Sequence, residues 1–157
     1  MMKNILYPTF AQGRAGLGLL ILRLVFGAAF VLHGLGKIPN AFSWMGPEAP
    51  VPGLLQALAA FSEFGGGIAI IFGLLTPLAA LGLLGTMTGA LLMVHLPAGQ
   101  PFASLDPTKT SFELPMTYWI IALTLLLTGP GAYSLDALLF NRSKKTDSTL
   151  SYRATTS

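Results

Sequence analysis

Four long apolar segments are the feature that most constrains what this chain can fold into. The segments predict helices at about residues 16–37, 54–74, 77–96 and 113–128. Each approaches the ~17–25 residues that cross a hydrocarbon core, although the fourth is short unless its first residues lie at the membrane interface. None alternates strictly between apolar and polar residues, which argues against a β-barrel. The expected fold is therefore all-α, a polytopic membrane four-helix bundle.

The composition also favours lipid as the surroundings of these segments. Hydrophobic residues make up 53% of the 157 residues and charged residues only 10%, whereas soluble domains carry about 25% charged residues. A soluble protein of this size has too little interior to bury so much apolar surface. The chain contains no cysteine, which excludes disulfides, thiol redox chemistry, iron–sulfur ligation and Cys-type zinc sites. The net charge of +3 is modest and comes largely from the tail, so a nucleic-acid partner is not expected.

Prolines and glycines mark the ends of the segments. Pro77 suits the first turn of the third helix, and Gly129-Pro130-Gly131 ends the fourth. Residues 133–140 then predict a short amphipathic helix on the membrane surface, and residues 142–157 a polar, disordered tail. Residues 1–141 thus form one membrane domain. Because Arg23 interrupts the first apolar run, we interpret that run as a retained helix rather than a cleaved signal peptide.

Lysine and arginine counts near the membrane ends predict the orientation. An even number of spans puts both termini on one side, and that side carries most of the basic residues. We expect it to be the cytoplasmic side of a bacterial inner membrane. The basic residues on that side are Lys3, Arg14, Arg142, Lys144, Lys145 and Arg153, against Lys37 and Lys109 on the other.

Six ionisable side chains fall within or at the ends of the apolar segments, where a central charge costs about 2.5–3.5 kcal/mol. Such residues usually face protein or water and mark function, so all six are candidates for ligand binding or proton handling. At about 100° per residue, the three in the first helix share a stripe roughly 80° wide that must face the bundle. The candidates are Arg23, His33, Lys37, Glu63, His95 and Glu113.

Depth along the helices predicts two polar groups. The backbones of Arg23 and Glu63 differ in depth by roughly 7 Å, so a mid-membrane ion pair between them is feasible. That pair either fixes the helix register or allows Glu63 to carry a proton or bind a polar head group. The other four candidates collect near the outer surface.

The outer cluster of His33, Lys37, His95 and Glu113 is expected to bind a ligand or handle protons. Its plainer interpretations are a lysine that extends to the interface and histidines that are merely hydrogen-bonded. Bis-histidine haem ligation is geometrically conceivable, but the sequence has no other haem signature. No metal site is predicted, although His33, His95 and Glu113 are residue types that could together bind a divalent metal ion.

Glycines within the second and third segments suggest close helix packing. Gly82, Gly85 and Gly89 share one face of the third segment, and Gly65, Gly66 and Gly67 lie within the second. Gly85 and Gly89 form a GxxxG pair, a pattern typical of tightly packed transmembrane helices.

At these residues the sequence resembles the DoxX family, over about residues 16–139. The order and spacing of the elements carry the resemblance, since single elements such as HGxxK are weak. The elements include Leu22-Arg23-Leu24, His33-Gly34 with Lys37, Glu63 with Gly66-Gly67, Gly73-Leu74 with Thr76, His95, Glu113, Gly129-Pro130-Gly131 and Ser134-Leu135-Asp136.

The resemblance implies a four-helix membrane protein of the bacterial inner membrane with a redox or quinone-associated role. Some DoxX-like proteins are subunits of quinone-linked oxidoreductases, including thiosulfate:quinone oxidoreductase, and others belong to oxidative-stress complexes. No catalytic residue is carried over from the family. The leading hypothesis is a membrane subunit that binds a quinone or a similar isoprenoid-tailed ligand in an apolar groove between its helices and works with other redox subunits. The alternatives are a small-solute transporter, acting alone or as a homo-oligomer, and a non-catalytic assembly subunit.

Overall fold

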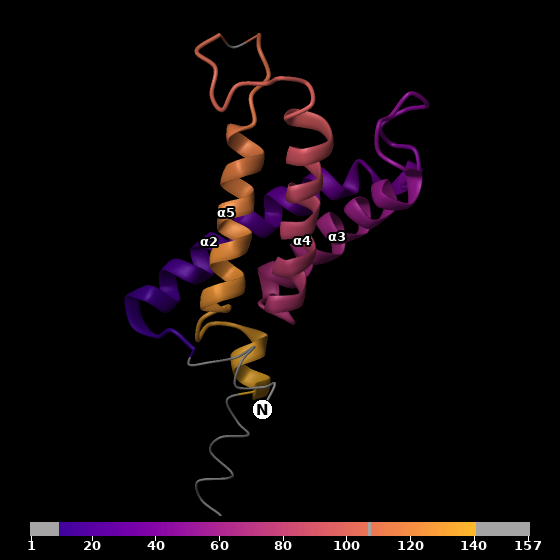
Figure 1. Cartoon of the computed structure of the whole chain (residues 1–157). Helices are drawn as coiled ribbons and strands as arrows, with labels where there is room; N and C mark the ends of the chain where they lie inside the picture. Colours follow the sequence, from indigo (N-terminus) through magenta and orange to yellow (C-terminus); the bar gives the residue numbers. More distant parts are fainter. Residues whose placement is uncertain (1–9, 107, 141–157) are drawn as a thin grey trace, which may run out of the picture.

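The computed structural model describes residues 10–106 and 108–140, and all regular structure in those ranges is helical. The expectation of an all-α fold is therefore confirmed. The predicted tail at residues 142–157 lies outside the described residues. The helices are α2 (Gly13–Leu35), η1 (Ile38–Asn40), α3 (Gly53–Phe72), α4 (Thr76–Ala90), η2 (Leu91–His95) and α5 (Glu113–Thr128) (Figure 1), followed by a helical stretch at residues 135–140.

Three of these helices are long and apolar enough to cross a membrane: Gly13–Leu35, Gly53–Phe72 and Thr76–His95. In each, no more than 33% of the most apolar window is buried within the protein, so most of its apolar surface is left for lipid. The helix α5 has only 16 residues, or about 24 Å at the usual rise. It is apolar but falls short of a full span.

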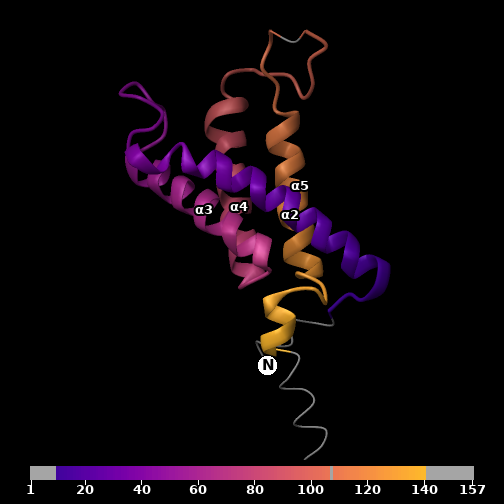
Figure 2. The same ribbon diagram turned by 180° about the vertical axis from the view of Figure 1, so that it is seen from behind.

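The helices α2 and α3 pack with their backbones in close contact, and α2 crosses α4 and α5, in front of them in the view of Figure 2. A Cβ atom added to Gly67 would lie 2.8 Å from the carbonyl oxygen of Gly27, and one added to Gly34 would collide with the backbone of Phe64. Glycine is needed at these positions because any side chain would push the two helices apart. Close packing by glycine is thus concentrated between α2 and α3.

The apolar core lies where α2, α3, α4 and α5 meet. Phe26 and Phe30 of α2, Ile70 of α3, Leu83 of α4 and Leu125 of α5 are each at most 2% exposed. The rings of Phe26 and Phe30 contact each other edge-on, with centroids 4.8 Å apart. Large apolar side chains on the outer faces of the same helices stay exposed, which suits helices surrounded by lipid.

The chain reverses after α5 and docks its last helical turns against the start of α4. Asp136 is fully buried, and its carboxylate accepts hydrogen bonds from the backbone N–H groups of Leu75 (2.7 Å) and Thr76 (2.8 Å). Its own N–H donates to the carbonyl oxygen of Gly73 at 2.8 Å. Asp136 therefore satisfies the free N–H groups at the α4 N-terminus, where a negative charge is also favoured.

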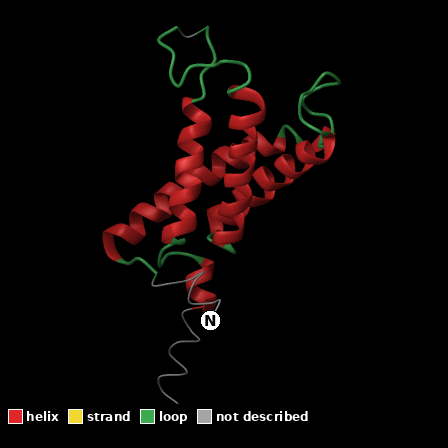
Figure 3. Cartoon of the chain, in the orientation of Figure 1, coloured by secondary structure: helices red, strands yellow, loops and turns green. Residues whose placement is uncertain are grey.

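The two longer loops lie together at the end of the molecule away from this contact (Figure 3). They connect α2 to α3 and η2 to α5. The start of α2 and the end of α5 therefore lie at one end of the molecule. The candidate residues near the loops, Lys37, His95 and Glu113, lie at the opposite end.

Candidate functional site

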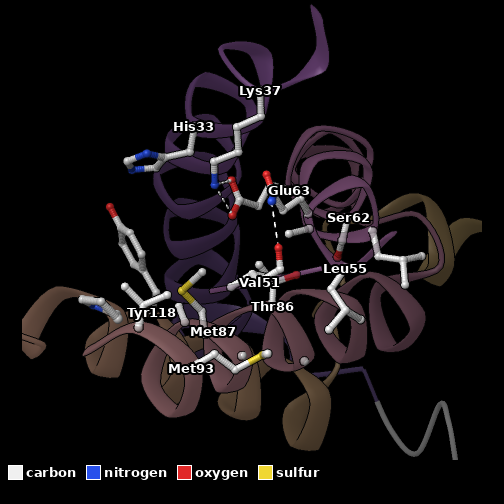
Figure 4. Close-up of a pocket in the computed structure, with 18 of the residues that line it drawn as sticks. His33, Lys37, Val51, Leu55, Ser62, Glu63, Thr86, Met87, Met93 and Tyr118 are labelled. Atoms are coloured by element: carbon white, nitrogen blue, oxygen red, sulfur yellow. Dashed lines mark hydrogen bonds and ion pairs between the residues drawn. The ribbon is translucent and has the colours of Figure 1, made fainter. Parts of the chain in front are cut away.

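A cavity of about 650 Å³ opens between α2, α3, α4 with η2, and the first turns of α5. Its walls are mostly apolar, and a few polar side chains face it from several helices (Figure 4). Four of the six candidate residues from the sequence line it: His33, Lys37, Glu63 and His95. The volume falls in the range of about 300–1,000 Å³ that is typical of small-molecule sites.

The strongest polar contact in the cavity joins Lys37 and Glu63. The Lys37 Nζ lies 2.6 Å from both carboxylate oxygens of Glu63, whose side chain is only 3% exposed. The same ammonium lies 4.3 Å from the ring centre of Trp44, a distance at which a cation is attracted to the face of an indole. A buried carboxylate requires such compensation, because its transfer from water is otherwise costly.

The expected ion pair between Arg23 and Glu63 is not formed. Arg23 is fully buried, but its guanidinium donates to the carbonyl oxygens of Tyr133 and Ile70. Asp136 lies close enough to act on it electrostatically, on the side of the molecule away from Glu63. Helical side chains lean toward the helix N-terminus, and this takes the arginine away from Glu63. Depth counted from the expected helix ends was therefore a poor guide. The helices α2 and α3 pack antiparallel with Gly34 beside Phe64, which brings Lys37 rather than Arg23 level with Glu63.

His33 and Tyr118 face each other across the cavity from α2 and α5 (Figure 4), with ring centroids 6.1 Å apart. Within residues 10–106 and 108–140, neither the imidazole of His33 nor the hydroxyl of Tyr118 has a hydrogen-bond partner. Tyrosine hydroxyls inside proteins normally find a partner. These two polar groups are thus free to bind a molecule in the cavity.

His95 lines the cavity but also contacts a loop. It ends the π-helical turn η2, where the N–H of Leu96 donates to the carbonyl oxygen of Leu91 at 2.9 Å. Its Nδ1 lies 2.6 Å from Oε1 of Gln100. Turns of this wider kind are rare and often occur at functional sites. Here the turn places three consecutive residues, Met93 to His95, on the cavity wall.

Glu113 does not belong to the cavity. It is exposed at the first turn of α5, while the next two residues, Leu114 and Pro115, line the wall. Among the residues that the structure describes, no three His, Asp or Glu side chains lie close enough together to hold a metal ion. His33, His95 and Glu113 are accordingly not brought together as metal ligands.

A loop covers the polar end of the cavity, and Gln56 holds it in place. The buried Gln56 amide donates to the carbonyl oxygen of Val51 (2.8 Å) and accepts from the N–H of Met45 (3.0 Å), while Trp44 Nε1 donates to the Gln56 carbonyl oxygen (3.0 Å). These bonds fix the indole beside Lys37. Gln56, Trp44 and Tyr118 were not among the site residues expected from the sequence. Two of them could have been noticed in the sequence, because Tyr118 places a hydroxyl group in the apolar fourth segment and Gln56 places an amide in the apolar second segment.

Fold and site together define a helical membrane protein with an apolar cavity that ends in a buried ion pair. Residues 18–96 match the DoxX family. This is half of the chain, from the second turn of α2 to just past η2, and it includes Lys37, Glu63 and His95. This chain belongs to the DoxX family, as its sequence motifs predict.

Relatives match beyond the family segment. The chain is 37% identical over 124 residues to "Inner membrane protein YqjF" of Escherichia coli (strain K12), covering 78% of this chain and 92% of that protein. It is 28% identical over 131 residues to "Putative oxidoreductase CatD" of Bacillus subtilis (strain 168), covering 82% and 91%. An uncharacterized protein of Haemophilus influenzae is 31% identical over 125 residues, covering 79% and 92%. No solved structure matches the chain significantly.

Proposed function

We propose that this protein is a membrane subunit of a quinone-linked oxidoreductase or oxidative-stress complex, and that its cavity binds the quinone. The observation that carries the proposal is an apolar cavity whose inner end holds the Lys37–Glu63 pair and the unpaired polar groups of His33 and Tyr118. Small-molecule sites generally combine apolar walls with a few such polar groups.

A quinone has the chemistry that these groups suit. Its ring is flat and apolar, and its two carbonyl oxygens accept hydrogen bonds. The ammonium of Lys37 and the hydroxyl of Tyr118 are donors, and the imidazole of His33 can donate from one ring nitrogen. Reduction of a quinone to a quinol takes two electrons and two protons. Glu63, His33 and His95 line the cavity and can exchange protons.

The electrons must come from outside the chain. The chain has no cysteine to hold an iron–sulfur cluster, so we propose that a partner subunit or its bound cofactor reduces the quinone. The name of the B. subtilis relative, which includes the word oxidoreductase, supports a redox role. The partner is then a second membrane protein or a soluble redox protein, and a homo-oligomer of this chain fits the same scheme.

We further propose that the protein crosses a bacterial inner membrane with both termini in the cytoplasm. The excess of basic residues in the terminal segments and the name of the E. coli relative support this. The cavity and the two long loops then face the outer side of the membrane, and the contact of Asp136 with α4 faces the cytoplasm.

Extraction of the protein in mild detergent tests the proposal. We expect purified protein to retain quinone, measured by solvent extraction and mass spectrometry, in an amount approaching one molecule per chain, and to copurify with a redox protein. The Glu63→Gln variant keeps an amide in contact with Lys37 and should fold, but should lose most of the retained quinone. Equal and negligible quinone in both proteins, with no redox partner, would favour a purely structural subunit.

A further inference from the structure

The helices α3 and α4 touch near the turn that joins them and separate toward the loops (Figure 1). Near the turn, a Cβ atom on Gly66 would lie 3.4 Å from Leu83, and one on Gly82 would lie 2.7 Å from the Ser62 hydroxyl. Farther along, a Cβ atom on Gly85 or Gly89 would meet nothing within 4 Å. The gap between the helices therefore begins just beyond Gly82.

This arrangement corrects the packing role expected for the GxxxG pair. Gly85 and Gly89 contact no neighbouring helix closely, and both line the cavity. Glycine inside a helix costs about 1 kcal/mol relative to alanine, and close packing does not compensate for that cost here. What the two glycines do provide is empty space along one wall.

The opposite wall and the mouth of the gap are apolar. Leu55, Leu58 and Ala59 of α3 line the cavity, and the side chains of Leu55 and Leu58 are 42% and 57% exposed. Both helices that flank the gap are of membrane-spanning length. The mouth thus opens sideways between two helices that are long and apolar enough to span a membrane, while the ion pair and His33 lie at the inner end.

We propose that the gap between α3 and α4 is a lateral entrance from the bilayer and holds the isoprenoid tail of the ligand. Gly85 and Gly89 then determine specificity, because they leave room for the tail, while Lys37, His33 and Tyr118 contact the ring. The site takes tail-bearing quinones in preference to the same ring without a tail. The inference rests on the proposed function, and it adds the substrate class and the route of entry.

Two probes with the same ring separate the tail from the head group: menaquinone-4, which has four prenyl units, and menadione, which has none. Trp44 lines the cavity, so quenching of its fluorescence reports binding. The Trp119→Phe background removes the second tryptophan, whose Nε1 donates to Thr88 outside the cavity lining. Binding is measured on the full chain in lipid nanodiscs.

The Gly85→Leu/Gly89→Leu variant should bind menaquinone-4 at least about tenfold more weakly, because leucine side chains fill the tail space. Menadione binding should change by less than about twofold. Gly65→Leu is the matched control: it lies on α3, is exposed, does not line the cavity, and has open space for a side chain. It should bind both probes like the parent. Gly85→Ala gives a milder variant that should keep the parent's thermal stability.

Each other outcome contradicts a specific part of the account. Unchanged menaquinone-4 affinity in the double leucine variant would overturn the tail assignment while leaving the proposed function intact. Equal losses for both probes would mean that the glycine wall contacts the ring, which also overturns it. If the parent protein shows no quenching by either quinone, the proposed function itself fails, and the tail channel fails with it.

Discussion

The Lys37–Glu63 pair couples the stability of the fold to the chemistry of the cavity. Glu63 is almost completely buried, whereas Lys37 is 20% exposed toward the cavity. Most of the compensation for the buried carboxylate therefore comes from one ammonium, which also contacts Trp44. The same ammonium is the strongest hydrogen-bond donor available to a ligand. Removing either charge should consequently affect both binding and folding.

We expect Lys37→Met to destabilise the protein by about 2–4 kcal/mol, because it leaves the buried Glu63 carboxylate without its cation. The double variant Lys37→Met/Glu63→Leu should recover most of that loss, since neither charge is then left unpaired. Thermal unfolding in detergent, followed by circular dichroism, measures the coupling between the two sites. Additive losses in the double variant would show that the pair contributes no coupling energy.

The identities of the site residues were largely predictable, but their partners were not. The rarity of charges in apolar segments singled out Lys37, Glu63 and His33, and the structure places all three at one cavity. The pairing of Arg23 with Glu63 was wrong because the antiparallel register of α2 and α3 places Arg23 beside Gly73 and Lys37 beside Glu63. Tyr118 was missed since a tyrosine in an apolar segment resembles any other aromatic residue of a core.

At the scale of the helices, the glycines divide into two kinds that the sequence does not distinguish. Gly34 and Gly67 allow α2 and α3 to touch, whereas Gly85 and Gly89 keep a wall of the cavity open. All four lie inside apolar helices with similar neighbours. Which partner helix faces a glycine depends on the crossing of the helices, and that is a property of the assembled fold.

A pair of alanine substitutions separates these two kinds. Gly34→Ala should lower stability by about 1–3 kcal/mol, because its Cβ atom would collide with the α3 backbone. Gly85→Ala, with open space around it, should leave stability unchanged or raise it by up to about 1 kcal/mol. Comparison of their thermal unfolding midpoints checks this, and equal midpoints would contradict the packing.

The contact between the last helical turns and α4 makes a separate prediction. Asp136→Ala should cost about 2–4 kcal/mol, because two N–H groups at the α4 N-terminus, that of Thr76 buried and that of Leu75 partly buried, lose their acceptor. Asp136→Asn retains one carbonyl oxygen and should cost less. Unfolding midpoints of the two variants in the same detergent measure the difference. If alanine were tolerated as well as asparagine, the capping role would be refuted.

At the scale of the whole molecule, hydropathy predicted the all-helical fold and the three helices of spanning length, because period and length are local properties. It also indicated that the fourth helix is short. Residues 133–140 were expected to form a short surface helix. The structure has a helical stretch at residues 135–140, and Asp136 within it packs against the N-terminus of α4. That contact joins residues about 60 positions apart, and no local pattern indicates it.

The proposed orientation can be tested because the chain lacks cysteine. Gln12 before α2 and Thr110 in the loop before α5 are both exposed. We expect Thr110→Cys to react with a membrane-impermeant maleimide in intact cells, and Gln12→Cys to react only after permeabilisation. Labelling of both positions from the same side would contradict the three crossings that separate them, by α2, α3 and α4 with η2, and the reverse pattern would contradict the orientation.

The most direct test of the central claim is covalent mapping of the quinone in the intact protein. A menaquinone analogue with a photoactivatable azide on its ring should label the peptides that carry Lys37 and Tyr118, and excess menaquinone-4 should abolish the label. Labelling confined to the exposed outer faces of the helices, or labelling that menaquinone-4 does not reduce, would contradict a quinone site in this cavity.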